Sequence, residues 1–185
     1  MDGFFFEPRL LHQLINLRKL GIKGVSDSTV KILSALSPVP TALEVLKLKV
    51  DRVSEQINLS SYPNIVKLLL NGGMPLNSEA FPPNLVKLTL VDFDVDSHVV
   101  AVLKKLPKLR ILKMVWCKHN EEKMDLSGDG DSFPQLEVLH IKYARGLSEV
   151  SCRDDMSMPK LKKLFLLIDT TSGVRLSERL AKLRV

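Results

Sequence analysis

Apolar residues return along this chain in one fixed order. The pattern Leu-x-x-Leu-x-Leu, in which Ile or Met also fills an apolar place, occurs seven times in 185 residues, and each copy begins 20 to 27 residues after the previous one. The first apolar positions of the copies are Leu17, Leu43, Ile65, Leu85, Leu109, Leu136 and Leu161. A period of this length indicates a repeat architecture, in which each copy is one structural unit stacked on the next.

The order of residues within a copy predicts a short strand. The fourth and sixth positions alternate with the fifth, as in a strand with one buried face, and the first position anchors the entry of the chain into that strand. A single copy cannot bury its own leucines, but copies stacked about 4.8 Å apart form one parallel sheet whose inner face the returning segments cover. We therefore expect an α/β leucine-rich-repeat solenoid, with a curved parallel sheet on the concave side and irregular loops and short helices on the convex side.

The returning segments between copies are uneven. A proline stands two or three places before the first apolar position in six copies, where it prevents a helix from continuing into the strand. Residues 27–36 and 97–106 have the apolar spacing of a helix, the second with Asp96 as N-cap. The other returns are predicted to be loops and single turns. Residues 180–185 fit either an eighth copy or a short closing helix after Ser177.

The ninth position of each copy, just after the predicted strand, is not uniform. Many leucine-rich repeats stack Asn or Cys there in a buried ladder, and only Cys117 fits that ladder here. The ninth positions hold Val25, Asp51, Gly73, Phe93, Cys117, Ala144 and Asp169. We therefore expect irregular repeats and a solenoid that twists and varies in curvature.

Length and composition predict one elongated domain, residues 1–185, with about seven repeats and no linker inside it. The apolar start Phe4-Phe5-Phe6 and the incomplete last copy lack the polar caps of a solenoid, so we expect a fragment of a longer protein. Cys117 and Cys152 are predicted to be free thiols of a cytoplasmic protein, because the chain has neither paired cysteine caps nor a signal peptide. No apolar run reaches the roughly 18 residues of a membrane helix.

Charge changes this picture through its location. The net charge is +6, and the third, fifth and seventh positions of the copies, which are expected to face outward from the sheet, carry nine of the 18 lysines. Two interpretations stay open: a solvated face kept soluble by lysines, or a binding surface for an acidic, partly apolar protein. Nucleic acid is a weaker candidate because no aromatic platform accompanies the lysines. The predicted protein-binding residues are Lys19, Lys23, Lys47, Lys49, Lys67, Leu69, Lys87, Ile111, Lys113, Lys142, Lys163 and Phe165.

Candidate chemistry is sparse. Residues 121–131 form the one acidic stretch, interpreted as a solvated loop or as a contact for a basic patch on another domain. Residues 92–96 begin like a calcium loop, but Ser97 and Leu103 stand where Gly and Glu are required. Cys117 and His119 are too few ligands for zinc. No catalytic set or phosphate loop is present, so we expect no enzyme activity and no cofactor.

The junctions that lead into the strands resemble those of a known family. Phe81-Pro-Pro-Asn-Leu-Val-Lys-Leu, Ser132-Phe-Pro-Gln-Leu-Glu-Val-Leu and Met158-Pro-Lys-Leu-Lys-Lys-Leu are similar to the C-terminal repeats of plant intracellular immune receptors, the coiled-coil nucleotide-binding leucine-rich-repeat proteins. Residues 4–48, 146–150 and 177–183 most resemble the helper receptors of the nightshade family, which are required for cell death. The resemblance covers nearly the whole chain.

The resemblance implies a regulatory module. In such receptors the repeats hold the nucleotide-binding domain in a silent, ADP-bound state, and its release permits nucleotide exchange, oligomer assembly, defence and cell death. ADP or ATP would bind only that domain, and the parent receptor would be cytoplasmic or associate with a membrane on activation. Partners implied are that domain, other immune receptors and pathogen effectors. The alternatives are a surface that binds an effector directly, the substrate-recognition repeats of an F-box ubiquitin-ligase adaptor, and, less favoured, a secreted receptor ectodomain.

Overall fold

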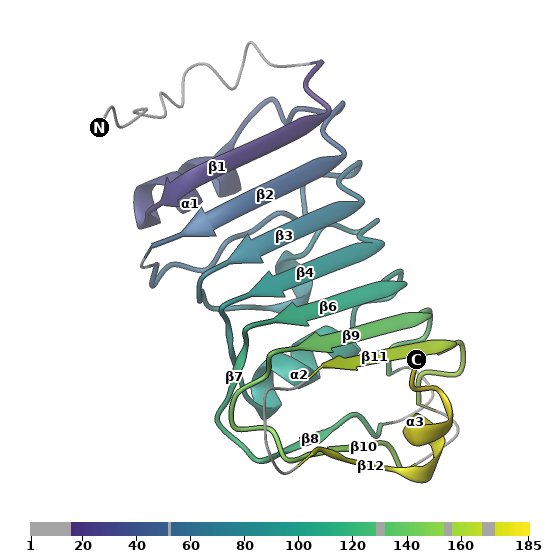
Figure 1. Cartoon of the computed structure of the whole chain (residues 1–185). Coiled ribbons are helices and arrows are strands. Elements are labelled where there is room, and N and C mark those ends of the chain that lie inside the picture. The colour runs from purple at the N-terminus through teal and green to yellow at the C-terminus, as the bar shows by residue number, and fades with distance from the viewer. Residues whose placement is uncertain (1–15, 52, 129–131, 154–156, 168–172) are drawn as a thin grey trace.

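The computed structural model describes residues 16–51, 53–128, 132–153, 157–167 and 173–185. Its main feature is a parallel sheet of seven strands that follow one another in chain order (Figure 1). Each copy of the repeat supplies one strand, as the spacing predicted. The strands are β1 (Lys19–Val25), β2 (Val45–Val50), β3 (Lys67–Asn71), β4 (Lys87–Val91), β6 (Ile111–Val115), β9 (Val138–Lys142) and β11 (Lys163–Leu167).

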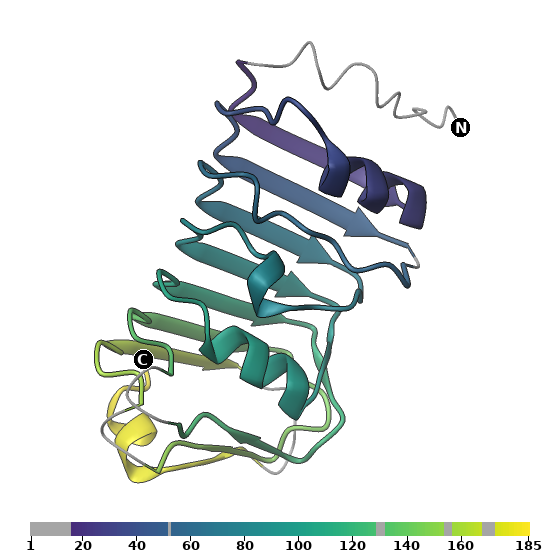
Figure 2. The same ribbon diagram turned by 180° about the vertical axis from the view of Figure 1, so that it is seen from behind.

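The register of the sheet aligns the same position of every copy. Leu68 pairs with Leu46 on one side and Leu88 on the other, and the sixth positions align in the same way. Most of these side chains are fully buried against the returning segments, which cover one face of the sheet (Figure 2). Each buried leucine stabilises the fold by about 2 kcal/mol relative to an exposed one, and it does so only when a neighbouring copy is present to cover it.

Two of the returning segments are helical, as their apolar spacing predicted. Helix α1 (Asp27–Ala35) buries Val30 and Leu33, and helix α2 (Ser97–Lys104) buries four residues. The carboxylate of Asp96 caps α2, because its Oδ1 accepts a hydrogen bond from the Val99 amide at 2.8 Å. A single 3-10 turn, η2 (Ser78–Ala80), lies in a third return. None of the described helices is long and apolar enough to cross a bilayer.

The prediction that the remaining returns are only loops and turns was wrong for those after β6, β9 and β11, whereas it holds for the described residues of the returns after β2 and β3. Strands β5 (Asp94–Val95) and β7 (Lys118–His119) pair in parallel, and β8 (Lys123–Asp125), β10 (Glu149–Ser151) and β12 (Arg175–Leu176) form a second sheet behind the main one. The acidic stretch therefore contains a strand. The alternation of exposed and buried residues in this strand spans only three residues, with Met124 buried between exposed Lys123 and partly exposed Asp125. So short a pattern does not predict a strand from sequence.

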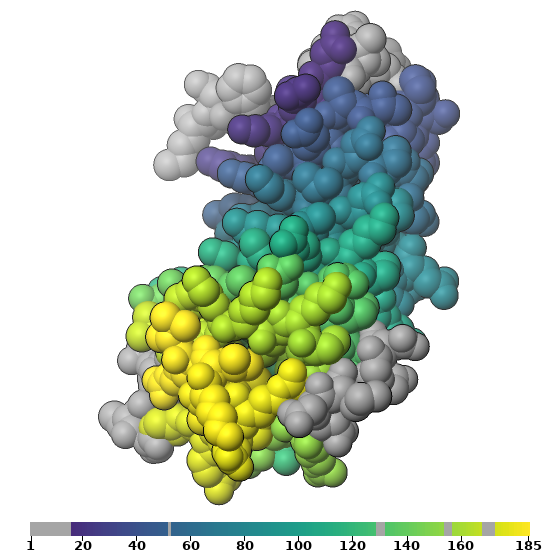
Figure 3. All heavy atoms as spheres, turned by 90° about the vertical axis from the view of Figure 1, so that its right-hand side faces the viewer, coloured from purple at the N-terminus to yellow at the C-terminus, as the bar shows by residue number. Residues whose placement is uncertain are grey.

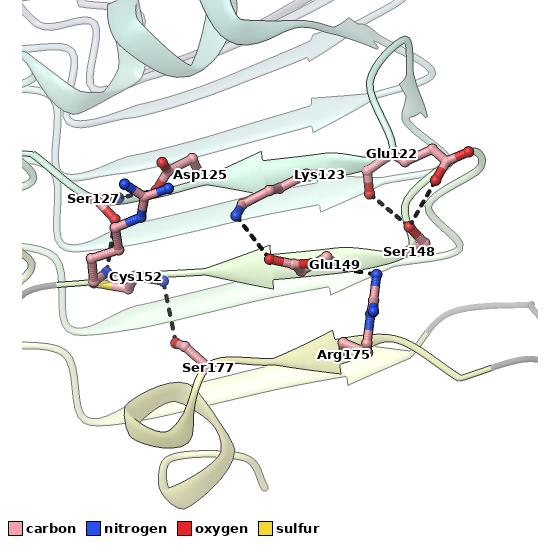
Figure 4. A network of polar contacts seen from close by, with 10 residues as sticks. Glu122, Lys123, Asp125, Ser127, Ser148, Glu149, Cys152, Arg175 and Ser177 are labelled. Carbon is pink, nitrogen blue, oxygen red and sulfur yellow. Dashed lines mark hydrogen bonds and ion pairs between the residues drawn. The ribbon is translucent and has the colours of Figure 1, made fainter.

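Side chains on the second sheet are joined across three copies (Figure 4). The Glu149 carboxylate lies 2.9 Å from the Lys123 ammonium group and 3.5 Å from the Arg175 guanidinium group. Such exposed pairs contribute little stability each. Their alternating signs match the register of the strands and disfavour a shifted pairing.

At the C-terminal end of the stack both interpretations of residues 180–185 hold in part. Helix α3 (Glu178–Lys182) follows Ser177 and places Leu180 in the core with no exposed surface. The chain then returns to the sheet, where Arg184 forms a parallel bridge with Leu164 of β11. Figure 3 shows the resulting elongated body, with this end at one extremity and β1 near the other.

Candidate protein-binding surface

The third, fifth and seventh positions of the seven strands form the outward side of the main sheet, which we call the open face. All twelve residues predicted to bind a protein lie on it, and each is exposed or partly exposed. Leucines of the fourth position point the opposite way into the core. The structure thus brings the predicted residues together on one surface, because the register aligns equivalent positions of every copy.

The open face carries charge of one sign. Its 21 positions, three on each of seven strands, hold nine lysines and no aspartate or glutamate. None of these lysines forms an ion pair with a carboxylate in the described chain, whereas ion pairs occur at the strand entries and on the second sheet. An unpaired row of cations creates a positive potential that favours an acidic partner.

Lysines and apolar residues are not evenly distributed on the open face. Strands β1 and β2 carry two open-face lysines each, and every later strand carries one lysine together with apolar residues such as Leu69, Ile111 and Phe165. The rings of His140 and Phe165 stack with centroids 4.3 Å apart, and Leu167 beside them is 49% exposed. The open face therefore changes along the stack from basic to mixed basic and apolar.

Three lysines lie near His140, which is on β9, the sixth of the seven strands of the open face. Burial, the largest cause, and the nearby Lys113, Lys142 and Lys87 together lower the pKa of His140 to about 4. Burial, Lys87 and Lys142 also lower the pKa of Lys113. A carboxylate placed among these groups would reverse part of both shifts, so this region can accept an anionic side chain.

Sequence reasoning missed a second set of exposed residues, at the eighth position of the copies. Gly24, Gly72, Asp92, Trp116 and Tyr143 all have a left-handed backbone, with φ between 54° and 92°. We call these five residues the strand-end row. The amides of four members, Gly72, Asp92, Trp116 and Tyr143, donate to the carbonyl of the seventh position in the next strand, as Trp116 does to Lys142 at 2.9 Å. The row therefore extends the sheet by one residue.

The left-handed residue reverses the alternation of the strand. In a continuing strand the eighth side chain would point into the core, as the fourth and sixth do. In the structure the eighth side chain of the fourth copy, Asp92, is exposed and the ninth, Phe93, is buried. Cys117 and Ala144 are buried in the same way. A recurring place for Gly or Asp before a buried residue was the signal that could have revealed this row.

The second copy has no left-handed residue at its eighth position, and the residue that occupies its buried ninth place is therefore not the one predicted from the sequence. Val50 is not left-handed, lies 5% exposed in the core and pairs with Val25 in the register. Asp51, counted as the ninth residue, is exposed. This copy lacks the additional residue, so its alternation continues without reversal, and Val50 rather than Asp51 is the structural equivalent of Val25.

Trp116 and Tyr143 are the two aromatic members of the strand-end row. Their rings are stacked, with centroids 4.1 Å apart and planes inclined by 12°. Trp116 nevertheless keeps 45% of its surface exposed. A bulky residue with positive φ is a strained choice where glycine serves as well, and strained residues of this kind concentrate at functional sites.

Cys117 and His119, the pair considered for zinc, lie in the core. Burial raises the pKa of Cys117 to about 11 and lowers that of His119 to about 4. No group of three potential metal ligands occurs among the described residues. A hollow of about 360 Å³ behind the sheet has charged walls, but Asp96 caps α2 there and Lys123 pairs with Glu149. This hollow therefore presents few free groups to a ligand.

Comparison with known proteins places these features in context. The chain is 71% identical over 184 residues to the ToMV susceptible protein tm-2 of Solanum lycopersicum and 67% identical to the ToMV resistance protein Tm-2(2) of the same plant. Each match covers 97% of this chain and 21% of the relative, so the chain spans about a fifth of the length of these proteins. No family model matches the chain, and no solved structure matches it.

Proposed function

Because this chain belongs to the leucine-rich-repeat region of plant nucleotide-binding leucine-rich-repeat resistance proteins, we propose that it acts as their non-catalytic, autoinhibitory interaction module. Its open face holds an acidic surface of the nucleotide-binding domain in the parent protein. The observation that carries this proposal is the open face itself, with nine lysines and no carboxylate. The repeats form a solenoid that presents this face, and they contribute to defence and cell-death signalling by restraint and release.

The restraint works through linkage between two states of the parent protein. The repeats stabilise the silent state only by binding it better than the active state. Shifting a two-state equilibrium strongly requires a difference of several kcal/mol. Several lysines acting on one acidic surface can supply such a difference, whereas a single exposed ion pair supplies at most about 1 kcal/mol. The many lysines therefore matter as a group.

We call the proposed contact between the open-face lysines and the acidic surface of the nucleotide-binding domain the lysine clamp. Charge reversal of neighbouring lysines tests it. Lys47, Lys67 and Lys87 lie on β2, β3 and β4, the first at the fifth position and the others at the third. We expect the triple change to glutamate in the full parent protein to cause cell death in leaves without a pathogen, because an acidic surface is then repelled. Binding of the separate nucleotide-binding domain to this chain should weaken by at least about tenfold, since several favourable contacts become repulsive.

A matched control changes the same charge elsewhere. Lys105, Lys108 and Lys160 are exposed and lie outside the open face. Their change to glutamate should leave the parent protein silent and the binding unchanged. If the open-face variant is as silent as its parent and binds the domain equally well, the electrostatic clamp is wrong for those lysines.

A second candidate function is direct recognition of a pathogen protein, which the apolar part of the open face favours. Phe165 and Leu167 offer exposed apolar surface, and buried aromatic anchors dominate many interfaces. Two of the relatives are named ToMV resistance proteins, which makes a viral protein the first ligand to try. Recovery of such a protein with the chain, lost with Phe165→Asp or Ile111→Asp and kept with Lys105→Asp, supports this function. Equal recovery by all variants excludes it for this surface.

A further inference from the structure

Two neighbours in the strand-end row, Asp92 and Trp116, carry groups that a lysine clamp does not use. One offers an exposed carboxylate and the other an exposed indole. We propose that they form a binding site for an arginine side chain of a protein partner. Its guanidinium group stacks on the free face of the Trp116 indole and pairs with the Asp92 carboxylate.

The free face of the indole follows from the stack. Tyr143 covers one face of Trp116, with ring centroids 4.1 Å apart. Tyr143 follows β9 and Asp92 follows β4, and β6, which precedes Trp116, lies between these two strands. The opposite indole face is therefore turned toward Asp92. A carboxylate on one methylene is too small to cover an indole, which agrees with the 45% exposure of Trp116.

The Asp92 carboxylate has no partner of its own in the described chain. Asp92 is exposed, and no ion pair or side-chain hydrogen bond engages it there. Asp94, two residues on, faces Lys118 in the register of β5 and β7, so a cation already stands beside it. On the side away from Trp116, the neighbour of Asp92 in the row is Gly72, which has no side chain. Space and negative charge thus occur together beside the indole.

Backbone conformation indicates that the aromatic side chains in this row have a use. Gly24 and Gly72 provide the left-handed turn without strain, whereas a non-glycine residue is strained there. Trp116 has φ of 58° and Tyr143 has φ of 54°. Phe133 and Met158 have the same backbone conformation and are buried in the core, whereas Trp116 is exposed, so packing inside the chain does not account for its ring.

The chemistry of the site selects arginine among possible side chains. A carboxylate beside an aromatic face attracts a cation, and a planar guanidinium group can stack on the ring and bond the carboxylate at the same time. Proline or leucine would leave the charge of Asp92 unmatched. Lys142 and Arg145 flank Tyr143 in the chain, on the side of the indole away from Asp92, and oppose a second cation there. The site therefore takes one arginine rather than a basic cluster.

Trp116 is the single tryptophan of the chain, so its fluorescence reports on this site directly. The purified chain is titrated with a blocked Gly-Arg-Gly peptide and with the same peptide carrying citrulline, which keeps the shape and loses the charge. We expect a saturable change of emission with the arginine peptide, and binding weaker by about fivefold or more with citrulline, in keeping with a cation–π contact.

Asp92→Asn should weaken the arginine response by a similar factor. Asp51→Asn, at an exposed strand end elsewhere, should leave it unchanged, and circular dichroism checks that both variants fold. An equal response to the two peptides, an unaltered response in Asp92→Asn, or no response at all overturns the proposal. The test contains no nucleotide-binding domain, so its outcome is separate from that of the lysine clamp.

Discussion

Whether a residue after a strand of this protein is buried or exposed depends on the alternation of the backbone more than on the polarity of its side chain. Val50 is buried and Asp92 is exposed at the corresponding step of the repeat, because only the second case has a left-handed residue. The same reversal carries Cys117 inward, where its thiol lies 3.8 Å from the Leu90 carbonyl oxygen. Two residues further, His119 enters the core with its Nε2 atom unpaired among the described residues. A buried imidazole in this setting must stay neutral.

The neutral state of His119 predicts a dependence of stability on pH. Its pKa falls from 6.5 to about 4 on folding, so the unfolded chain binds a proton at a higher pH than the folded chain. The stabilising effect is fully present above about pH 6.5 and is lost as pH falls toward 4, by up to about 3 kcal/mol.

Denaturant unfolding between pH 4 and 7 measures this effect. His119→Asn should flatten the fall in the free energy of unfolding, although His140 contributes a part that remains. His98→Asn, at an exposed position, should keep the slope of the parent. Identical slopes in the parent and in His119→Asn would contradict the assignment.

Among the secondary-structure elements, the two longer helices differ in how they begin. Asp96 accepts the Val99 amide at the start of α2, but Ser26 at the start of α1 makes no such bond. Asp27, in the first turn of α1, instead accepts the amides of Ser54 and Glu55 in the next return, both at 2.9 Å. One helix is therefore capped locally and the other is fastened to its neighbour, although both sequences start with similar polar residues.

This difference predicts unequal effects of two similar changes. Asp96→Ala should lower the free energy of unfolding by about 1 kcal/mol, because the Val99 amide loses its partner. Ser26→Ala should change it by a few tenths of a kcal/mol at most. Chemical denaturation of the two variants and the parent distinguishes the cases, and equal losses would show that the cap at Asp96 is not what stabilises α2.

For the whole molecule, the sequence predicted the main sheet and missed the second one. Strands such as β4 follow from leucines that recur with a fixed spacing and need no knowledge of their neighbours. Strand β10 has three residues, and only its pairing with β8 and β12 makes it a strand. The open-face residues were placed correctly for the first reason. Trp116 and Tyr143 were missed because simple alternation would place their side chains in the core. The left-handed backbone at these residues turns them outward instead.

The second sheet has a mechanical consequence for the molecule. Strands stack about 4.8 Å apart, whereas a helix with its side chains is about 10 Å wide. Copies five to seven carry β8, β10 and β12 behind β6, β9 and β11, so the same strand spacing applies on both sides, and we expect these copies to stack with little curvature. Helices α1 and α2 belong to earlier copies. The last three copies should thus behave as a flat, stiff block, and any bending that fits the molecule to a partner will occur in the copies before them.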